Sequence, residues 1–131
     1  MIILDTCTLI FDALTPDKLS SKAVRAIENG EKQGLLACSD ISLWETAMLV
    51  SKGRLDPGTD ALSFIKWALS ARNIQVLPII PEIACLSSSH EAFVHQYPTD
   101  RLIAATTIYH KGSLVTCDGL LLKIRELPTI W

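Results

Sequence analysis

Continuous apolar runs alternate along the chain with stretches in which apolar residues recur every three or four positions. Residues 1–4 form a continuous apolar run, which is typical of a strand buried on both faces of a parallel sheet. Between Ser20 and Gly34, the apolar residues Ala23, Val24 and Ile27 recur at helical spacing, so this stretch is expected to be a helix. The alternation of strand and helix over the whole length predicts an α/β domain.

The remaining elements follow from the same patterns and from turn residues. Further strands are predicted at residues 35–38, 74–77 and 114–116, with a closing edge strand at 129–131. Further helices are predicted at residues 42–52, 59–71, from Pro81 onward, at 101–110 with Thr99 as the N-cap, and at 120–125. We expect a mainly parallel sheet with helices on both faces, in which residues 1–4 and 114–116 are central.

Length and composition are those of one domain, which we assign to residues 1–131. A hydrophobic content of 49% is enough for one well-buried core. The formal net charge of −2 gives no general attraction to a polyanion, so any nucleic-acid binding must come from a local basic patch or from metal ions. No apolar run is long enough to cross a bilayer, and we expect a cytoplasmic protein.

The cysteines and histidines show no pattern of a zinc site or a catalytic triad. The four cysteines are scattered without a C-x-x-C pair, so we expect reduced, packed thiols. The three histidines form no H-E-x-x-H motif. These residues are Cys7, Cys38, Cys85 and Cys117, and His90, His95 and His110.

Four acids occupy positions where a parallel sheet builds ligand sites. Asp5 and Asp118 directly follow predicted strands, Asp100 lies at the start of a helix, and Glu45 lies in the first turn of a helix that follows a strand. Ligands of open parallel sheets bind outside the carboxyl ends of the strands. We therefore expect the four carboxylates to face one crevice.

Carboxylates packed together raise one another's pKa unless a cation compensates their charge. Oxygen ligands suit Mg²⁺, with Mn²⁺ as a possible substitute. Such an ion activates water and neutralises charge on a phosphodiester. The predicted chemistry is therefore metal-dependent hydrolysis of a nucleic acid.

Each acid also has a structural interpretation. Asp5 can cap a helix that begins near Thr6, and Asp118 with Gly119 can form an ordinary turn. Ser42 and Glu45 match a capping box, and Asp100 suits the positive end of a helix dipole. Four independent caps have no reason to converge on one sheet edge, and this joint placement favours a functional site.

Four segments together resemble PIN-domain proteins, specifically VapC-type toxins of bacterial or archaeal toxin–antitoxin pairs. The segments are ILDTCTLI at residues 3–10, ISLWE at 41–45, PTDRLIAA at 98–105 and LVTCD at 114–118. Their order and spacing are specific to the family. The resemblance covers essentially the whole chain and implies a three-layer PIN-like fold.

The resemblance also implies an activity, that of a Mg²⁺-dependent endoribonuclease, and a cognate antitoxin as partner. It makes Asp5, Glu45, Asp100 and Asp118 the metal-binding acids, supported by the polar residues Thr6 and Thr116. One departure is Tyr97, because many relatives carry an acid in the segment before Pro98. A possible accessory carboxylate is therefore missing.

Other interpretations stay open at this point. The stretch from Leu4 to Leu9 resembles the nucleophile loop of haloacid-dehalogenase-like phosphotransferases, although Cys7 stands where that chemistry needs a second Asp. A receiver-like signalling domain needs a phosphoacceptor Asp after a middle strand, and none follows residues 74–78. A degenerate PIN domain that only binds its antitoxin is the third alternative.

Binding surfaces are less clearly marked. Arg101 directly follows Asp100 and is the best candidate for an RNA contact. Four large apolar residues lie on amphipathic helices and are expected in the core, whereas any exposed member would form an interface. They are Trp44, Met48, Phe64 and Trp67. Together with the resemblance, these faces predict a homodimer.

Overall fold

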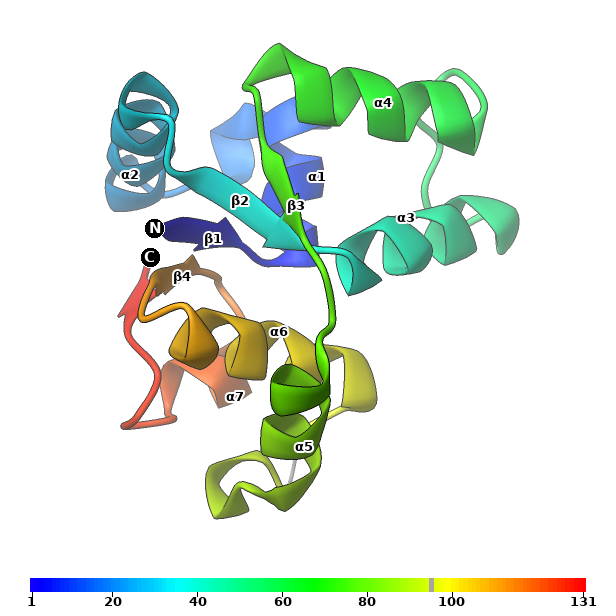
Figure 1. Cartoon of the computed structure of the whole chain (residues 1–131). Coiled ribbons are helices and arrows are strands. Elements are labelled where there is room, and N and C mark those ends of the chain that lie inside the picture. The colour runs from blue at the N-terminus through cyan, green and yellow to red at the C-terminus, as the bar shows by residue number, and fades with distance from the viewer. Residues whose placement is uncertain (95) are drawn as a thin grey trace.

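The computed structural model describes residues 1–94 and 96–131, so His95 lies outside the described residues. These residues form a five-stranded sheet in the order β3-β2-β1-β4-β5 (Figure 1). The strands are β1 (Ile2–Leu4), β2 (Leu36–Ser39), β3 (Gln75–Leu77), β4 (Ser113–Val115) and β5 (Thr129–Ile130). The helices are α1 (Thr6–Leu14), α2 (Ser21–Gln33), α3 (Ile41–Ser51), α4 (Ala61–Ala71), α5 (Pro81–Ser89), α6 (Pro98–Tyr109) and α7 (Gly119–Leu122), with short 3₁₀ turns η1 (Pro16–Lys18) and η2 (Glu91–Phe93).

Strand β1 lies at the centre of the sheet and fixes its register. Leu4 is paired with Cys38 of β2 on one side and with Val115 of β4 on the other, and both pairings are parallel. The outer pairs β2–β3 and β4–β5 are parallel as well. The predicted parallel sheet, with residues 1–4 at its centre and an edge strand near the C-terminus, is therefore confirmed.

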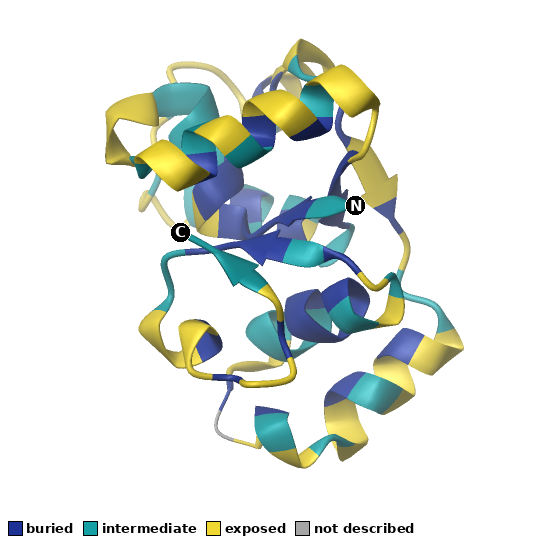
Figure 2. Ribbon diagram, turned by 90° about the vertical axis from the view of Figure 1, so that its left-hand side faces the viewer, coloured by how far each residue is buried: buried dark blue, intermediate teal, exposed yellow. Residues whose placement is uncertain are grey.

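Successive residues of β1 point into two different cores, as the two-residue period of a strand requires. Ile3 packs with residues of α5, α6 and α7, including Ile83, Ile103 and Leu121. Leu4 packs on the opposite face with residues of α1 and α2 such as Leu9. Figure 2 shows the buried residues concentrated in the sheet and on the helix sides that face it. The expected three layers are confirmed.

The start of α6 differs from the prediction. The helix begins at Pro98, with Tyr97 in the N-cap position, whereas Thr99 was expected to cap it. Proline suits the first helical position because its fixed φ is helical and its missing N–H has no partner there in any case. Thr99 is therefore inside the helix, and its hydroxyl is available for a different contact.

Two predictions about buried side chains are wrong in part. Phe64 is buried, but Trp44 and Trp67 have exposed fractions of 57% and 52%. Among the cysteines, Cys38 is buried, whereas Cys7 and Cys85 are exposed. All four cysteines are free. Within the described part of the chain, no helix is both long enough and apolar enough to span a membrane.

Candidate active site

Asp5 is the buried centre of the candidate site. It follows β1 directly and its exposed fraction is 3%. Its Oδ1 accepts a hydrogen bond of 2.8 Å from the backbone N–H of Thr6, and its Oδ2 accepts one of 2.7 Å from the hydroxyl of Thr116. Asp5 is therefore both the N-cap of α1 and a carboxylate held from two sides. The structural and the functional interpretations of this residue are compatible.

The protonation of Asp5 reflects its surroundings. Burial raises the pKa of this carboxyl from 3.8 to about 6, although the hydrogen bonds from Thr116 and Thr6 act in the opposite direction. The negative charges of Glu45 and Asp118 raise the pKa further. Asp5 is thus an acid whose ionised form the fold disfavours in the absence of a cation.

Asp100 lies in the first turn of α6 and is electrostatically coupled to the other acids. The pKa of Asp100 is raised from 3.8 to about 7. Burial is the largest cause, and the negative charges of Asp5, Asp118 and Glu45 add to it. Four acids that are far apart in the sequence therefore act on one another at one edge of the sheet. The structure brings together the residues that sequence analysis singled out.

Asp118 and Asp5 share a hydroxyl group. The backbone N–H of Asp118 donates to Thr116 Oγ1 at 3.1 Å, while the same hydroxyl donates to Asp5. Asp118 also caps α7, because its Oδ1 accepts from the N–H groups of Leu120 and Leu121 at 2.9 and 3.1 Å. The hydroxyl of Thr116 thus links the acids that follow β1 and β4.

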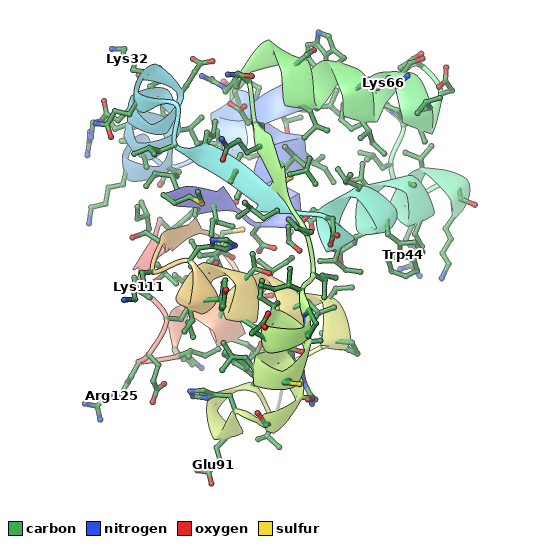
Figure 3. The ribbon with its side chains drawn as sticks, in the orientation of Figure 1. Lys32, Trp44, Lys66, Glu91, Lys111 and Arg125 are labelled. Carbon is green, nitrogen blue, oxygen red and sulfur yellow. The ribbon has the colours of Figure 1, made fainter. Side chains whose placement is uncertain are left out.

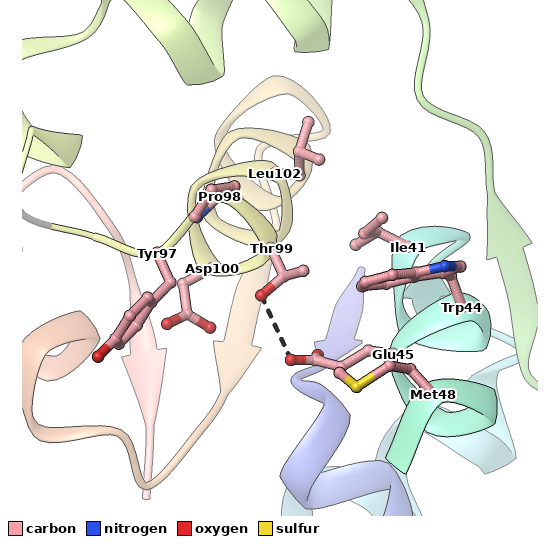
Figure 4. Close-up of a pocket in the computed structure, with 9 residues that line it drawn as sticks. All are labelled: Ile41, Trp44, Glu45, Met48, Tyr97, Pro98, Thr99, Asp100 and Leu102. Carbon is pink, nitrogen blue, oxygen red and sulfur yellow. Dashed lines mark hydrogen bonds between the residues drawn. The ribbon is translucent and has the colours of Figure 1, made fainter. Parts of the chain in front are cut away.

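Glu45 does not form the capping box that its spacing from Ser42 suggested. Helix α3 begins at Ile41, so Ser42 already lies within it, and the hydroxyl of Ser42 accepts a bond of 2.9 Å from Thr6 Oγ1. Glu45 Oε2 instead accepts a bond of 3.3 Å from the hydroxyl of Thr99 on α6 (Figure 4). Sequence analysis missed this role of Thr99, because nothing in the sequence shows that α3 and α6 are neighbours at this point.

Arg101 is engaged within its own segment. Its Nε donates to the backbone oxygen of Gln96, and its second guanidinium nitrogen donates to the backbone oxygen of Val94, both at 3.0 Å. The side chain therefore holds the chain that leads into α6. An RNA contact by Arg101 stays a prediction.

A divalent cation fits the chemistry of these side chains. The four acids supply hard oxygen donors, and the pKa values of Asp5 and Asp100 are raised first by burial and further by the neighbouring acids, so a cation would stabilise their ionised forms. Within residues 1–94 and 96–131, no three His, Cys, Asp or Glu side chains are arranged as a ready-made set of metal ligands. The fit therefore rests on the donor chemistry and the charge of the acids.

Comparisons with known proteins give one consistent result. A family model described as the PIN domain matches residues 2–127. The chain is 30% identical over 132 residues to Ribonuclease VapC22 of Mycobacterium tuberculosis, covering 99% of this chain and 98% of that protein.

Two solved structures share the fold of this chain. One is VapBC2 from Rickettsia felis bound to a DNA fragment from its promoter, with a TM-score of 0.75, 21% identity and coverage of 98% of this chain and 97% of that one. The other is a toxin–antitoxin complex from Klebsiella pneumoniae, with a TM-score of 0.65, 20% identity and coverage of 97% and 95%. At these identities the structural likeness concerns the fold.

Proposed function

Because the chain belongs to the PIN-domain family, we propose that it is a Mg²⁺-dependent endoribonuclease and the toxin of a toxin–antitoxin pair. Family membership removes the haloacid-dehalogenase-like and receiver-like alternatives. The observation that carries the proposal is the cluster of Asp5, Glu45, Asp100 and Asp118, in which burial and the neighbouring negative charges raise the pKa values of Asp5 and Asp100. The ribonuclease activity of the relative from M. tuberculosis supports the choice of RNA as substrate.

The four acids are the proposed ligands of the cation, with Mg²⁺ preferred and Mn²⁺ as a substitute. When bound, the ion supplies activation of water and neutralisation of charge on the scissile phosphodiester. Thr116 orients Asp5 and the backbone of Asp118, and Thr6 fixes Asp5 through its N–H. Thr99 holds Glu45 toward α6. These bonds orient the carboxylates before substrate arrives, as an efficient site requires.

The proposed partners are a cognate antitoxin and a second copy of the chain. The toxin–antitoxin complex from K. pneumoniae supports the former through its shared fold. Trp67, which is exposed rather than buried, leaves apolar surface available for such contacts. Size-exclusion chromatography with light scattering is expected to show twice the chain mass, and a monomer would remove the dimer without affecting the catalytic proposal.

The test is cleavage of total cellular RNA by the purified chain. We expect cleavage with Mg²⁺ or Mn²⁺ and none with EDTA. Asp100→Asn is expected to lose activity because Asn keeps the size but not the charge that holds a hard cation. Glu45→Gln is expected to do the same, since Glu45 is not a capping residue, and Asp118→Asn is expected to lose less because Asn also caps helices.

Mapping the RNA ends after brief expression without antitoxin would identify the cleaved sites. A folded chain that binds Mg²⁺ and its antitoxin but leaves RNA intact would show the non-catalytic alternative to be correct. Full activity in EDTA would show that the metal mechanism is wrong.

A further inference from the structure

An apolar cavity of about 630 Å³ lies between α3 and α6, beside the acid cluster. We call it the aromatic cleft. Its volume is within the range of small-ligand sites. Ile41, Trp44 and Met48 line it from α3, and Tyr97, Pro98 and Leu102 line it from the start of α6.

The aromatic cleft shares residues with the acid cluster. Glu45 and Asp100 are also part of its lining, together with Thr99. The hydrogen bond from Thr99 to Glu45 links the two helices that form the cleft, and Trp44 and Tyr97 lie on either side of this bond (Figure 4). A group seated in the cleft therefore lies next to the acids proposed to act on the phosphodiester.

The two aromatic side chains are largely free of packing. Tyr97 has an exposed fraction of 72% and Trp44 one of 57%. Trp44 projects from the side of α3 that faces away from α4 (Figure 3). Exposed aromatic rings beside a hydrolytic site offer flat faces on which a planar group can stack.

The charged residues that line the aromatic cleft indicate which kinds of ligand it can bind. The nine lining residues include two acids, Glu45 and Asp100, but neither Lys nor Arg. A phosphate or an acidic peptide would be repelled here, whereas an uncharged planar ring would not. An unstacked RNA base is such a ring, and it is joined through its ribose to the phosphate that the acids would act on.

We infer that the aromatic cleft binds a nucleobase of single-stranded RNA, stacked on Trp44 and flanked by Tyr97. The inference rests on the proposed RNA-cleaving function and adds the part of the substrate that this surface contacts. It also gives Tyr97 a role in place of the accessory carboxylate that many relatives carry. The cleft would thereby restrict cleavage to unpaired nucleotides.

Binding can be tested without cleavage. Trp67→Phe and Trp131→Phe leave Trp44 as the only tryptophan of the chain, and Asp5→Asn is added to prevent cleavage because Asp5 does not line the cleft. The probes are a twelve-nucleotide single-stranded RNA, the same strand with abasic sites, and its duplex. We expect the single strand to quench Trp44 fluorescence and to bind about tenfold more tightly than the abasic strand, the loss expected for one base stack.

Equal binding and quenching by the intact and abasic strands would overturn the inference. So would quenching by the duplex that equals that of the single strand. If the wild-type chain fails to cleave RNA but the intact strand alone quenches Trp44, the catalytic proposal fails while the base site stands.

Kinetics supply a second test with a matched control. Trp44→Ala is expected to raise KM for single-stranded RNA about tenfold with little change in kcat, and Trp44→Phe is expected to restore most of the loss. Trp67→Ala removes an equally exposed tryptophan from α4 and is expected to leave KM within twofold. An unchanged KM in Trp44→Ala, accompanied by loss of the dimer or of antitoxin binding, would assign the cleft to a protein partner and contradict the inference.

Discussion

Helix α1 has Asp5 as its N-cap and Asp12 near its C-terminus, and the two acids have different electrostatic surroundings. Asp12 accepts a bond of 2.7 Å from Arg72 Nε, and Arg72 also reaches Glu31 at 3.4 Å. Asp12 thereby raises the pKa of Arg72 by hydrogen bonding. Asp5, at the other end, is surrounded by further acids, and none of the salt bridges in the described residues includes it.

This contrast separates an acid with a salt-bridge partner from an acid without one. The Asp12–Arg72–Glu31 group joins α1, the end of α4 and α2, and each charge in it has an opposite partner. Among the described residues, no salt bridge includes the acids around Asp5, which is a cost to the metal-free protein and agrees with the proposed cation site. The predictions below test the contrast from its largest to its smallest expected effect.

The metal-free protein is expected to be more stable at pH 5 than at pH 8. The folded pKa of Asp5, about 6, lies above its unfolded value of 3.8, so folding favours the protonated form. Ionised Asp5 lowers the free energy of unfolding by about 3 kcal/mol. This loss is fully present above pH 6 and disappears as the pH falls toward 4. Asp100, with a pKa of about 7, acts in the same direction.

Urea unfolding in EDTA at the two pH values measures this difference. Asp5→Asn serves as the control, because it is expected to remove the contribution of Asp5 to the pH dependence, to leave that of Asp100, and to stabilise the metal-free chain at pH 8. A wild-type protein that loses stability between pH 8 and pH 5 would contradict the assignment of Asp5 as an uncompensated acid.

Arg72→Ala breaks the compensated group and is expected to cost about 2 kcal/mol of unfolding free energy. The Asp12 side chain has an exposed fraction of 8% and would be left without its partner. The 28% exposure of Arg72 keeps the expected cost below that of a fully buried pair. Urea unfolding of this variant is compared with Arg25→Ala, an exposed Arg whose loss is expected to cost under about 0.5 kcal/mol.

RNA cleavage by folded Arg72→Ala is expected to be unchanged at a temperature where the variant remains native. A variant as stable as the wild type would show that the ion pairs contribute nothing to the fold.

Thr116→Val is expected to weaken Mg²⁺ binding about tenfold. The hydroxyl bonds to Asp5 Oδ2 and lowers the pKa of that carboxyl, so its loss would also shift the pH profile of cleavage upward. Thr8→Val is the matched control, because the buried hydroxyl of Thr8 donates to the backbone oxygen of Val115 and to no acid. Equal Mg²⁺ affinities in the two variants would argue against the orienting role of Thr116.

Most of the fold followed from local patterns, whereas contacts between helices did not. The apolar run of β1 and the acids at the ends of β1 and β4 are visible in the sequence, because a parallel sheet places its strand ends together. The bond from Thr99 to Glu45 and the start of α6 at Pro98 depend on how α3 and α6 pack. Trp44 was expected in the core because helical periodicity shows an apolar face but not whether another element covers it.

The comparison between the two ends of α1 also supplies the most direct test of the central claim. Asp5→Asn and Asp12→Asn make the same chemical change on the same helix, and RNA cleavage is measured for both against Mg²⁺ concentration. We expect Asp5→Asn to lose at least about a thousandfold in rate at every Mg²⁺ concentration, and Asp12→Asn to keep wild-type cleavage despite a lower melting temperature. Wild-type activity in Asp5→Asn, or equal losses in the two folded variants, would contradict the account.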